Sequence, residues 1–447
     1  MVTSGVWQRN IALKPATVPG DPGQVGQSSW ARYLVLIWLL GMLFLLPLDL
    51  IKLPFNVTLV DCWVFLATPL FWLAFRQGQY VISWSYVLPM WLILVASFAS
   101  SFVAPAPLSS FIVIVKEIYA YIWFVTLAAL LARLHDRDFR LVLLVWTGVV
   151  FFHGFVIVGQ FLSPALWRFI ADLAGSVKDY ELYRPAGLFA NANPAAFFQA
   201  LGFVPLVLVS PSQKVGVIGG VFLFLTMVMT GSMGATIAFL TGLTVAVMAI
   251  FLIGRLALIL KLFAQLALIL VLAAGVLSLV VSHNERYQAH FERIFFGRAE
   301  RSSEGRFDLW RRGLDAYLEN DVFLWGVGPE NFREVDAKMT DNQLHNDFIA
   351  FAVERGLLGS LGLVLFAAVA VIRAGRLLRI GSQQPDQSRL AVVVFLGAMI
   401  ATLVESLTHQ IFHFRTLWVV LAFQEAMFFQ LVPPVVRARK VVKCQVN

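Results

Sequence analysis

Long apolar runs separated by short polar breaks are the main pattern along this chain of 447 residues. About 20 apolar residues suffice for a membrane-spanning helix, which satisfies its backbone hydrogen bonds internally. The pattern therefore predicts an all-α, polytopic membrane protein of about 12 transmembrane helices. The predicted spans are 33–50, 57–75, 81–103, 109–132, 141–163, 195–210, 215–230, 234–253, 256–282, 347–372, 390–407 and 410–432.

Basic residues divide the short connections between these spans into two groups. On the side of the N-terminus they are frequent, whereas Lys52 is the exception among the short connections opposite. Positively charged loops stay in the cytoplasm, so both termini are predicted to be cytoplasmic. The basic residues on the predicted cytoplasmic side are Arg76, Arg133, Arg137, Arg140, Lys214, Arg255, Lys261, Arg373, Arg376, Arg379 and Arg389.

The transmembrane bundle is expected over residues 33–432. Residues 1–32 are rich in Pro, Gly, Gln and Ser and predict a disordered cytoplasmic tail, while 433–447 form a basic cytoplasmic tail. With 59% hydrophobic and 13% charged residues, no soluble domain of ordinary size is left outside the spans. The net charge of +8 follows the topology and requires no nucleic acid. Cys62 and Cys444 are not expected to form a disulfide.

Two longer connections, 164–194 and 283–346, fall on the predicted periplasmic side. The second lies between spans nine and ten and contains nine Lys/Arg and twelve Asp/Glu. Its residues 307–319 have apolar side chains at helical spacing, which predicts an amphipathic helix with Ser302 or Ser303 as the N-cap. A tight Gly-rich turn follows at 325–331. A large charged loop on an otherwise lean bundle is where we expect function.

His345 sits at the end of this loop, at the mouth of the tenth span. A helix N-terminus disfavours imidazolium, and a neutral imidazole can accept a proton from a hydroxyl. His345 is therefore the candidate catalytic base. The alternative is a histidine that merely caps its helix.

Arg184 and Arg306 are the candidate phosphate ligands, because guanidinium groups fork onto phosphate oxygens and need no metal to do so. Arg184 precedes the turn-rich entry to the sixth span, and Arg306 leads the amphipathic helix. The alternative for Arg184 is that it anchors the chain at the membrane interface. The alternative for Arg306 is that it lies on a solvated helix face. For Arg311 and Arg312, the solvated face is the favoured interpretation.

Two acidic pairs suggest rival chemistry. Asp136 and Asp138 form a D-x-D motif of the kind that holds a metal-bound nucleotide sugar, but they lie in a short basic loop without a nucleotide domain. Asp179 and Glu181 could bind a divalent metal on the outer side, although two carboxylates alone make a poor site. No metal or cofactor is predicted.

Ionisable residues inside the spans suggest a second class, a proton-coupled transporter. Such residues usually face the bundle interior and pair with each other. His409 and His413 have i,i+4 spacing without an evident third metal ligand and are interpreted as polar residues at a helix end. The other ionisable residues in or near spans are Asp61, Lys116, Glu117, His153, Glu405, Arg415 and Glu425.

Taken together, the motifs over about 160–375 resemble the O-antigen ligase and O-antigen polymerase superfamily of membrane glycosyltransferases. The matching segments are Arg184-Pro-x-Gly187-x-x-x-Asn191-x-Asn193, Arg306-x-x-x-Trp310, Gly326-Val-Gly328-Pro-x-Asn331, His345-Asn346 and Glu354-x-Gly356. Length and the lack of a C-terminal soluble domain look most like a ligase. One departure concerns the turn 230–234, where many members carry an Arg and this chain has Met233. Arg184 and Arg306 are the candidates to serve instead.

The resemblance implies transfer of O-antigen polysaccharide from undecaprenyl pyrophosphate to a hydroxyl of lipid A–core, with inversion, on the periplasmic face of the bacterial inner membrane. It assigns catalysis to His345 and phosphate binding to Arg184 and Arg306. An O-antigen polymerase is the alternative within the superfamily. The residues expected to support the site are Asn191, Asn193, Trp310, Gly326, Gly328, Asn331, Asn346 and Glu354.

Overall fold

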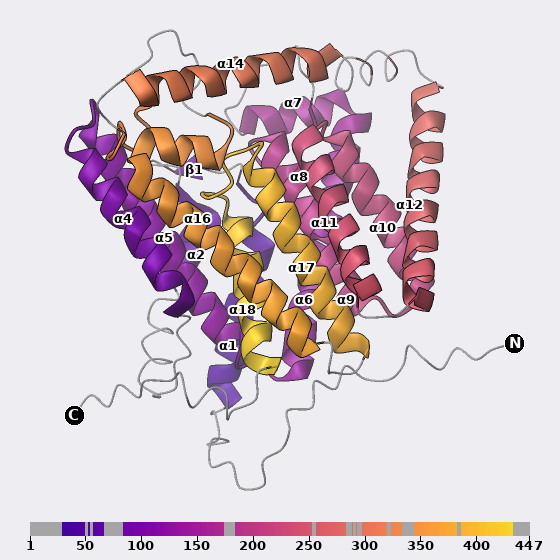
Figure 1. The fold of residues 1–447 in the computed structure, drawn as a ribbon. Helices are drawn as coiled ribbons and strands as arrows, with labels where there is room; N and C mark the ends of the chain where they lie inside the picture. Colours follow the sequence, from indigo (N-terminus) through magenta and orange to yellow (C-terminus); the bar gives the residue numbers. More distant parts are fainter. Residues whose placement is uncertain are drawn as a thin grey trace, which may run out of the picture.

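The structure is a computed structural model that describes residues 29–49, 52–53, 57–66, 84–173, 184–252, 256–282, 288, 292, 297–319, 323–332, 344–381 and 386–431. Helices dominate, and most lie side by side in one bundle (Figure 1). A short 3-10 helix, η2 (Trp84–Tyr86), precedes α4, and two-residue strands β1 (Lys52–Leu53) and β2 (Val57–Thr58) pair antiparallel. The bundle helices are α1 (Ser29–Leu45), α2 (Leu59–Leu66), α4 (Val87–Ser101), α5 (Pro107–Leu131), α6 (Asp136–Leu162), α8 (Ala192–Leu201), α9 (Phe203–Val209), α10 (Gln213–Met229), α11 (Met233–Leu252), α12 (Leu256–Ser282), α16 (Asp347–Gly381), α17 (Asp386–Ser406) and α18 (Arg415–Leu431).

The apolar helices make this an all-α, multi-pass membrane protein, as the hydrophobic pattern predicts. A helix lies in each predicted span, and the number that cross the bilayer stays a prediction. Five helical segments among the described residues are long and apolar enough to cross a membrane, judged by length and composition: Pro107–Leu131, Asp136–Leu162, Ala192–Val209, Met233–Phe251 and Asp347–Ile380.

Two further helices lie at one end of the bundle and are not aligned with the bundle axis. The predicted amphipathic helix is present as α14 (Gly297–Glu319), which extends across that end (Figure 1). The prediction of Ser302 or Ser303 as its N-cap is wrong, because both residues lie within the helix. The other helix, α7 (Pro164–Leu173), occupies a segment expected to be loop.

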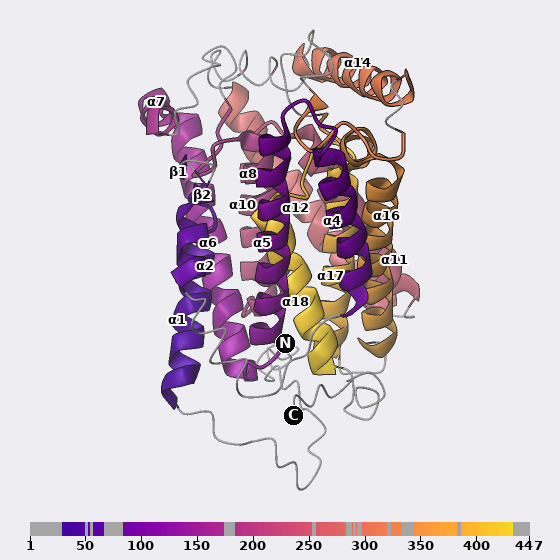
Figure 2. The same ribbon diagram turned by 90° about the vertical axis from the view of Figure 1, so that its left-hand side faces the viewer.

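The arrangement of the helices gives the bundle two distinct ends. In both views α14 lies at one end, while α1 begins and α18 ends at the opposite end (Figures 1 and 2). Within the bundle, α18 is buried without interruption from Thr416 to Met427. This central helix supports the segments that carry the candidate site.

Charged residues inside the bundle form ion pairs, which confirms that part of the sequence-based expectation. Arg355 Nη2 lies 2.5 Å from Glu117 Oε1, and Arg415 Nη2 lies 2.5 Å from Asp61 Oδ2. Pairing keeps such charges tolerable away from water. Further ion pairs are Arg355–Glu354, Arg415–Asp49, Arg32–Asp138 and Arg373–Glu425.

Candidate active site

His345 lies at the end of the bundle covered by α14, just before α16. Its neighbours on both sides are anchored. Trp310 Nε1 of α14 donates a hydrogen bond to the carbonyl oxygen of Leu344 at 2.8 Å. Asn346 Oδ1 caps α16 by accepting from the backbone N–H of Ile349 at 3.1 Å. Because Asn346 provides this cap, the geometry gives no support to a capping role as the reason for a histidine at 345.

The connection between α17 and α18 holds the same segment from the other side. Asn346 Nδ2 donates to the Leu407 carbonyl oxygen at 3.0 Å, and Asp347 accepts from the backbone N–H of Ile411 at 3.0 Å. The backbone of His345 adopts a φ of +50°. Non-glycine residues seldom adopt this conformation, which persists where the surroundings over-determine it.

Arg306 approaches the same place from α14. One of its terminal nitrogens, Nη2, lies 3.2 Å from Nε2 of His409, which belongs to the α17–α18 connection. The imidazole of His409 is also close to that of His345, with ring centroids 6.2 Å apart. The structure thus brings Arg306 and His345, which are 39 positions apart in the sequence, to a common neighbour.

Arg184 is held at the turn between α10 and α11. Its Nε donates to the carbonyl oxygen of Thr230 at 2.8 Å, and its Nη2 donates to Asn193 Oδ1 at 2.9 Å. Asn191 caps α8 by accepting from the backbone N–H of Asn193 at 2.8 Å. The Asn-x-Asn motif therefore has two roles: Asn191 caps α8, and Asn193 orients the side chain of Arg184.

The segment after Arg184 is fixed by two polar side chains of α6. Gln160 Oε1 accepts from the backbone N–H groups of Ala186 and Gly187, at 3.0 Å and 2.8 Å. His153 Nε2 lies 3.3 Å from the Ala186 carbonyl oxygen. Gly187 has a φ of +61°, and a Cβ there would run into the ring of His153. These contacts explain the glycine of the Arg-Pro-x-Gly motif.

The α10–α11 turn connects Arg184 with the other candidate residues. A Cβ built at Gly234, at the start of α11, would press on the Thr408 hydroxyl and the ring of His409. The turn that Arg184 contacts at Thr230 is therefore packed against the histidine that Arg306 contacts. Arg184 thus contacts the same 230–234 turn that contains Met233.

The glycines of the 325–331 turn dock this segment onto a break in α16. Gly356 has a φ of +63°, which interrupts the helix and frees the carbonyl groups that precede it. The backbone N–H of Val327 donates to Val353 O, and that of Gly328 donates to Glu354 O, each at 2.9 Å. Gly326 and Gly328 also have positive φ angles, which glycine adopts without strain.

Two of the expected supporting residues act at a distance from His345. Asn331 is fully buried and ties the turn to α5, since its Nδ2 donates to Ser110 Oγ at 2.8 Å and its Oδ1 accepts from the Ala106 N–H at 2.7 Å. Glu354 accepts from Arg355 Nη1 at 2.8 Å. Both residues hold the scaffold together, and neither has a contact with Arg306 that would place it among the groups around His409.

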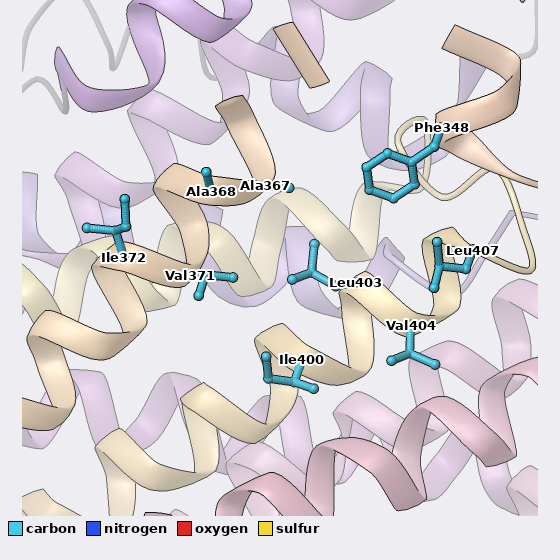
Figure 3. A pocket seen from close by; sticks show the side chains of 9 residues that line it. All are labelled: Phe348, Ala367, Ala368, Val371, Ile372, Ile400, Leu403, Val404 and Leu407. Atoms are coloured by element: carbon cyan, nitrogen blue, oxygen red, sulfur yellow. The ribbon is translucent and has the colours of Figure 1, made fainter. Parts of the chain in front are cut away.

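An apolar groove runs between α16 and α17 and begins beside the site. It encloses about 530 Å³. Figure 3 shows Phe348 and Leu407 close to each other at one end of the groove. Phe348 directly follows Asp347, and Leu407 accepts the hydrogen bond from Asn346. The lining side chains are Phe348, Ala367, Ala368, Val371, Ile372, Ile400, Leu403, Val404 and Leu407.

The rival metal sites gain nothing from the structure. Asp138 is committed to Arg32, with Oδ2 2.6 Å from Nε. Asp179 and Glu181 lie outside the described residues. Within the described ranges, there is no group of three or more His, Cys, Asp or Glu side chains that could hold a metal ion.

His409 and Glu405 belong to the cluster around Arg306, but they were not predicted as site residues from the sequence. Both were interpreted as residues at a helix end or inside a span, although their i,i+4 spacing could have indicated a pair. The contact with Arg306 could not be foreseen, because it joins residues 103 positions apart.

Residues 218–364 match a family model described as O-antigen ligase. The match runs from α10 to the middle of α16 and includes Arg306 and His345, while Arg184, Glu405 and His409 lie outside it. No curated protein matches the chain.

Proposed function

We propose that this chain is an O-antigen ligase, a proposal supported by the match of residues 218–364 to a family model described as O-antigen ligase. The proposed reaction transfers O-antigen polysaccharide from undecaprenyl pyrophosphate to a hydroxyl of lipid A–core. The proposed site is the end of the bundle under α14, on the periplasmic face of the inner membrane. The observation that carries the proposal is the convergence of Arg306 and His345 on His409, with Arg184 at the adjoining turn.

In this proposal the two arginines stabilise the leaving group. The bond between the anomeric carbon and the pyrophosphate oxygen breaks, so negative charge grows on the undecaprenyl pyrophosphate. Guanidinium groups in fixed positions stabilise such charge without reorganising during the reaction. Arg184 and Arg306 are held by neighbouring side chains and backbone, which is the arrangement this role requires.

His345 acts as the base in the same step. The acceptor hydroxyl attacks the anomeric carbon from the side opposite the leaving group, and His345 takes the hydroxyl proton. A single displacement of this kind inverts the anomeric centre. The step needs no metal and no nucleotide.

The groove between α16 and α17 supports a lipid-linked donor. Its walls are apolar, and its end at Phe348 lies next to the segment that carries His345. A polyprenyl chain in this groove would leave the attached pyrophosphate at the polar end. We therefore assign the groove to the tail of the donor.

The function is tested by deleting the gene and examining lipopolysaccharide on gels. A ligase predicts bare core together with lipid-linked polymer that accumulates, and restoration by the intact gene. Core that carries a single repeat unit would instead identify an O-antigen polymerase. An unchanged ladder would contradict both and leave a transporter as the surviving class.

A further inference from the structure

His409 and Glu405 form a buried pair directly behind Arg306. Nδ1 of His409 lies 2.6 Å from Oε1 of Glu405, and the side chains are 3% and 0% exposed. The backbone N–H of His409 donates to the carbonyl oxygen of Glu405 at 2.8 Å, which extends the last turn of α17 to this residue. The imidazole is therefore fixed through both its ring and its backbone.

The two contacts of the ring specify its tautomer. A Glu405 carboxylate can only accept, and it lies 2.6 Å from Nδ1, with the Thr408 hydroxyl 3.3 Å from the same nitrogen, so the ring proton belongs on Nδ1. Arg306 can only donate, so its contact at Nε2 requires a lone pair there. His409 is thus neutral, with the ring proton on Nδ1 beside the Glu405 carboxylate and Nε2 as the acceptor from Arg306.

The surroundings of His409 maintain this neutral form. Burial lowers the pKa of His409, and the nearby charges of Arg306 and His345 lower it further, against the opposing effect of Glu405. The other element packed on the ring is α11, which contributes backbone at Gly234. A neutral ring leaves the positive charge of Arg306 undiminished and avoids repulsion between two adjacent cations.

We propose that His409, oriented by Glu405, is a positioning residue that fixes the guanidinium of Arg306 for the pyrophosphate of the donor. This inference rests on the proposed function. A long arginine side chain has many rotamers, and one bond from a rigid buried acceptor selects among them before the donor binds. The guanidinium, held in one orientation, then presents a fixed positive charge to the phosphate oxygens.

His409 does not serve as a second base in this scheme. Its Nε2 lone pair is occupied by Arg306, and its Nδ1 carries the ring proton beside the Glu405 carboxylate. Taking a proton from an acceptor hydroxyl would break one of these bonds. That step belongs to His345, whose ring centroid lies 6.2 Å from that of His409.

The test compares two polar replacements of His409 in purified protein in lipid nanodiscs. His409→Gln places an oxygen near the position of Nε2, whereas His409→Asn keeps a group near Nδ1 and has no atom at Nε2. The readout is the dissociation constant for undecaprenyl pyrophosphate alone. We expect His409→Asn to weaken binding about tenfold, the factor for one hydrogen bond to a charged group, and His409→Gln to recover most of the loss.

A double-mutant cycle with Arg306→Ala separates positioning from a general structural role. If His409 acts through Arg306, His409→Asn changes the dissociation constant by less than about twofold once Arg306 is absent. The matched control is His413→Asn on the same connection, whose ring contacts Glu117 at 3.4 Å and not Arg306. Its effect, whatever its size, is expected to be additive with Arg306→Ala.

Additive effects of His409→Asn and Arg306→Ala would overturn the inference, as would equal losses for the Asn and Gln variants. The proposed function fails separately, because it requires transfer to lipid A–core. Binding that shows the coupling without such transfer would refute the ligase and retain the role of His409. Wild-type protein that does not bind undecaprenyl pyrophosphate would refute both.

Discussion

The backbone of His345 is strained, and its conformation can be considered separately from the chemistry of the imidazole side chain. A non-glycine residue at a φ of +50° raises the free energy of the folded state by about 1–3 kcal/mol. Hydrogen bonds of the flanking residues help to hold this conformation, from Trp310 Nε1 to the Leu344 carbonyl oxygen and from the backbone N–H of Ile411 to the Asp347 carboxylate. The side chain can therefore be changed while the segment keeps its course.

We predict that His345→Gly folds at least as stably as the wild type and loses transfer. Glycine adopts positive φ without strain, so the melting temperature in detergent should stay the same or rise. Transfer from a lipid-linked donor to lipid A–core should fall by about 10²–10⁴-fold, the usual contribution of a general base. His345→Gln, which is polar but not basic near neutrality, should be equally poor. Substantial turnover by the Gln variant would make His345 a structural residue.

Arg184 is predicted to require its planar, forked side chain. It donates from two different nitrogens, Nε to Thr230 O and Nη2 to Asn193 Oδ1, and a lysine cannot reproduce that geometry. Arg184→Ala should lose most transfer, by about tenfold or more, and Arg184→Lys should recover only part of it. Arg311→Ala is the matched control on α14, because that side chain is 82% exposed. An Arg184→Lys enzyme with wild-type kinetics would reduce this residue to a simple positive charge.

At the scale of the elements, the hydrophobic pattern predicted the helices well because apolar runs of this length have few other solutions in a bilayer. Boundaries and breaks were less predictable. The start of α14 at Gly297 lies before the serines that would make good caps, and the break at Gly356 depends on the partner turn at 326–328 that uses the freed carbonyl groups. Propensity describes the chain alone, and these features depend on contacts between distant segments.

The candidate site shows the same division. Arg184, Arg306 and His345 could be named from their motifs, and the structure relates all three to one cluster. His409 and Glu405 could not be named, because a histidine at a helix end has many ordinary roles. Only the packing of α14 over the α17–α18 connection gives His409 its contact with Arg306.

The groove between α16 and α17 leads to a prediction about the donor's lipid. Ala368→Trp should occupy part of the groove and raise the KM for an undecaprenyl-linked donor by about tenfold, equivalent to roughly 1.4 kcal/mol of lost binding. The control is Val364→Trp on the same helix, because Val364 is exposed and does not line the groove. A donor with a short prenyl chain should distinguish the variants less. A higher KM for the lipid A–core acceptor alone would assign the groove to the acceptor's lipid.

The two ends of the bundle carry different features: the candidate site lies at one end, and the basic α5–α6 connection lies at the other. Helix α7 and helix α14, which carries Arg306, lie at one end of the bundle (Figures 1 and 2). The described basic residues of the α5–α6 connection, such as Arg133, belong to the opposite end, where α1 begins and α18 ends. The helix arrangement is thus compatible with the membrane orientation that the basic residues predict.

Reporter fusions test that orientation for the entire molecule. We predict that alkaline phosphatase joined after Glu319, at the end of α14, is active, since the enzyme folds only in the periplasm. The same reporter joined at Arg133, between α5 and α6, should be inactive, and a fluorescent protein that matures in the cytoplasm should show the reverse. The physical reason is the excess of Arg and Lys in the short connections on the side of Arg133, because positively charged loops resist translocation across the membrane. The opposite result at both positions would invert the bundle, place Arg306 and His345 in the cytoplasm, and remove the periplasmic glycan donor from the proposed reaction.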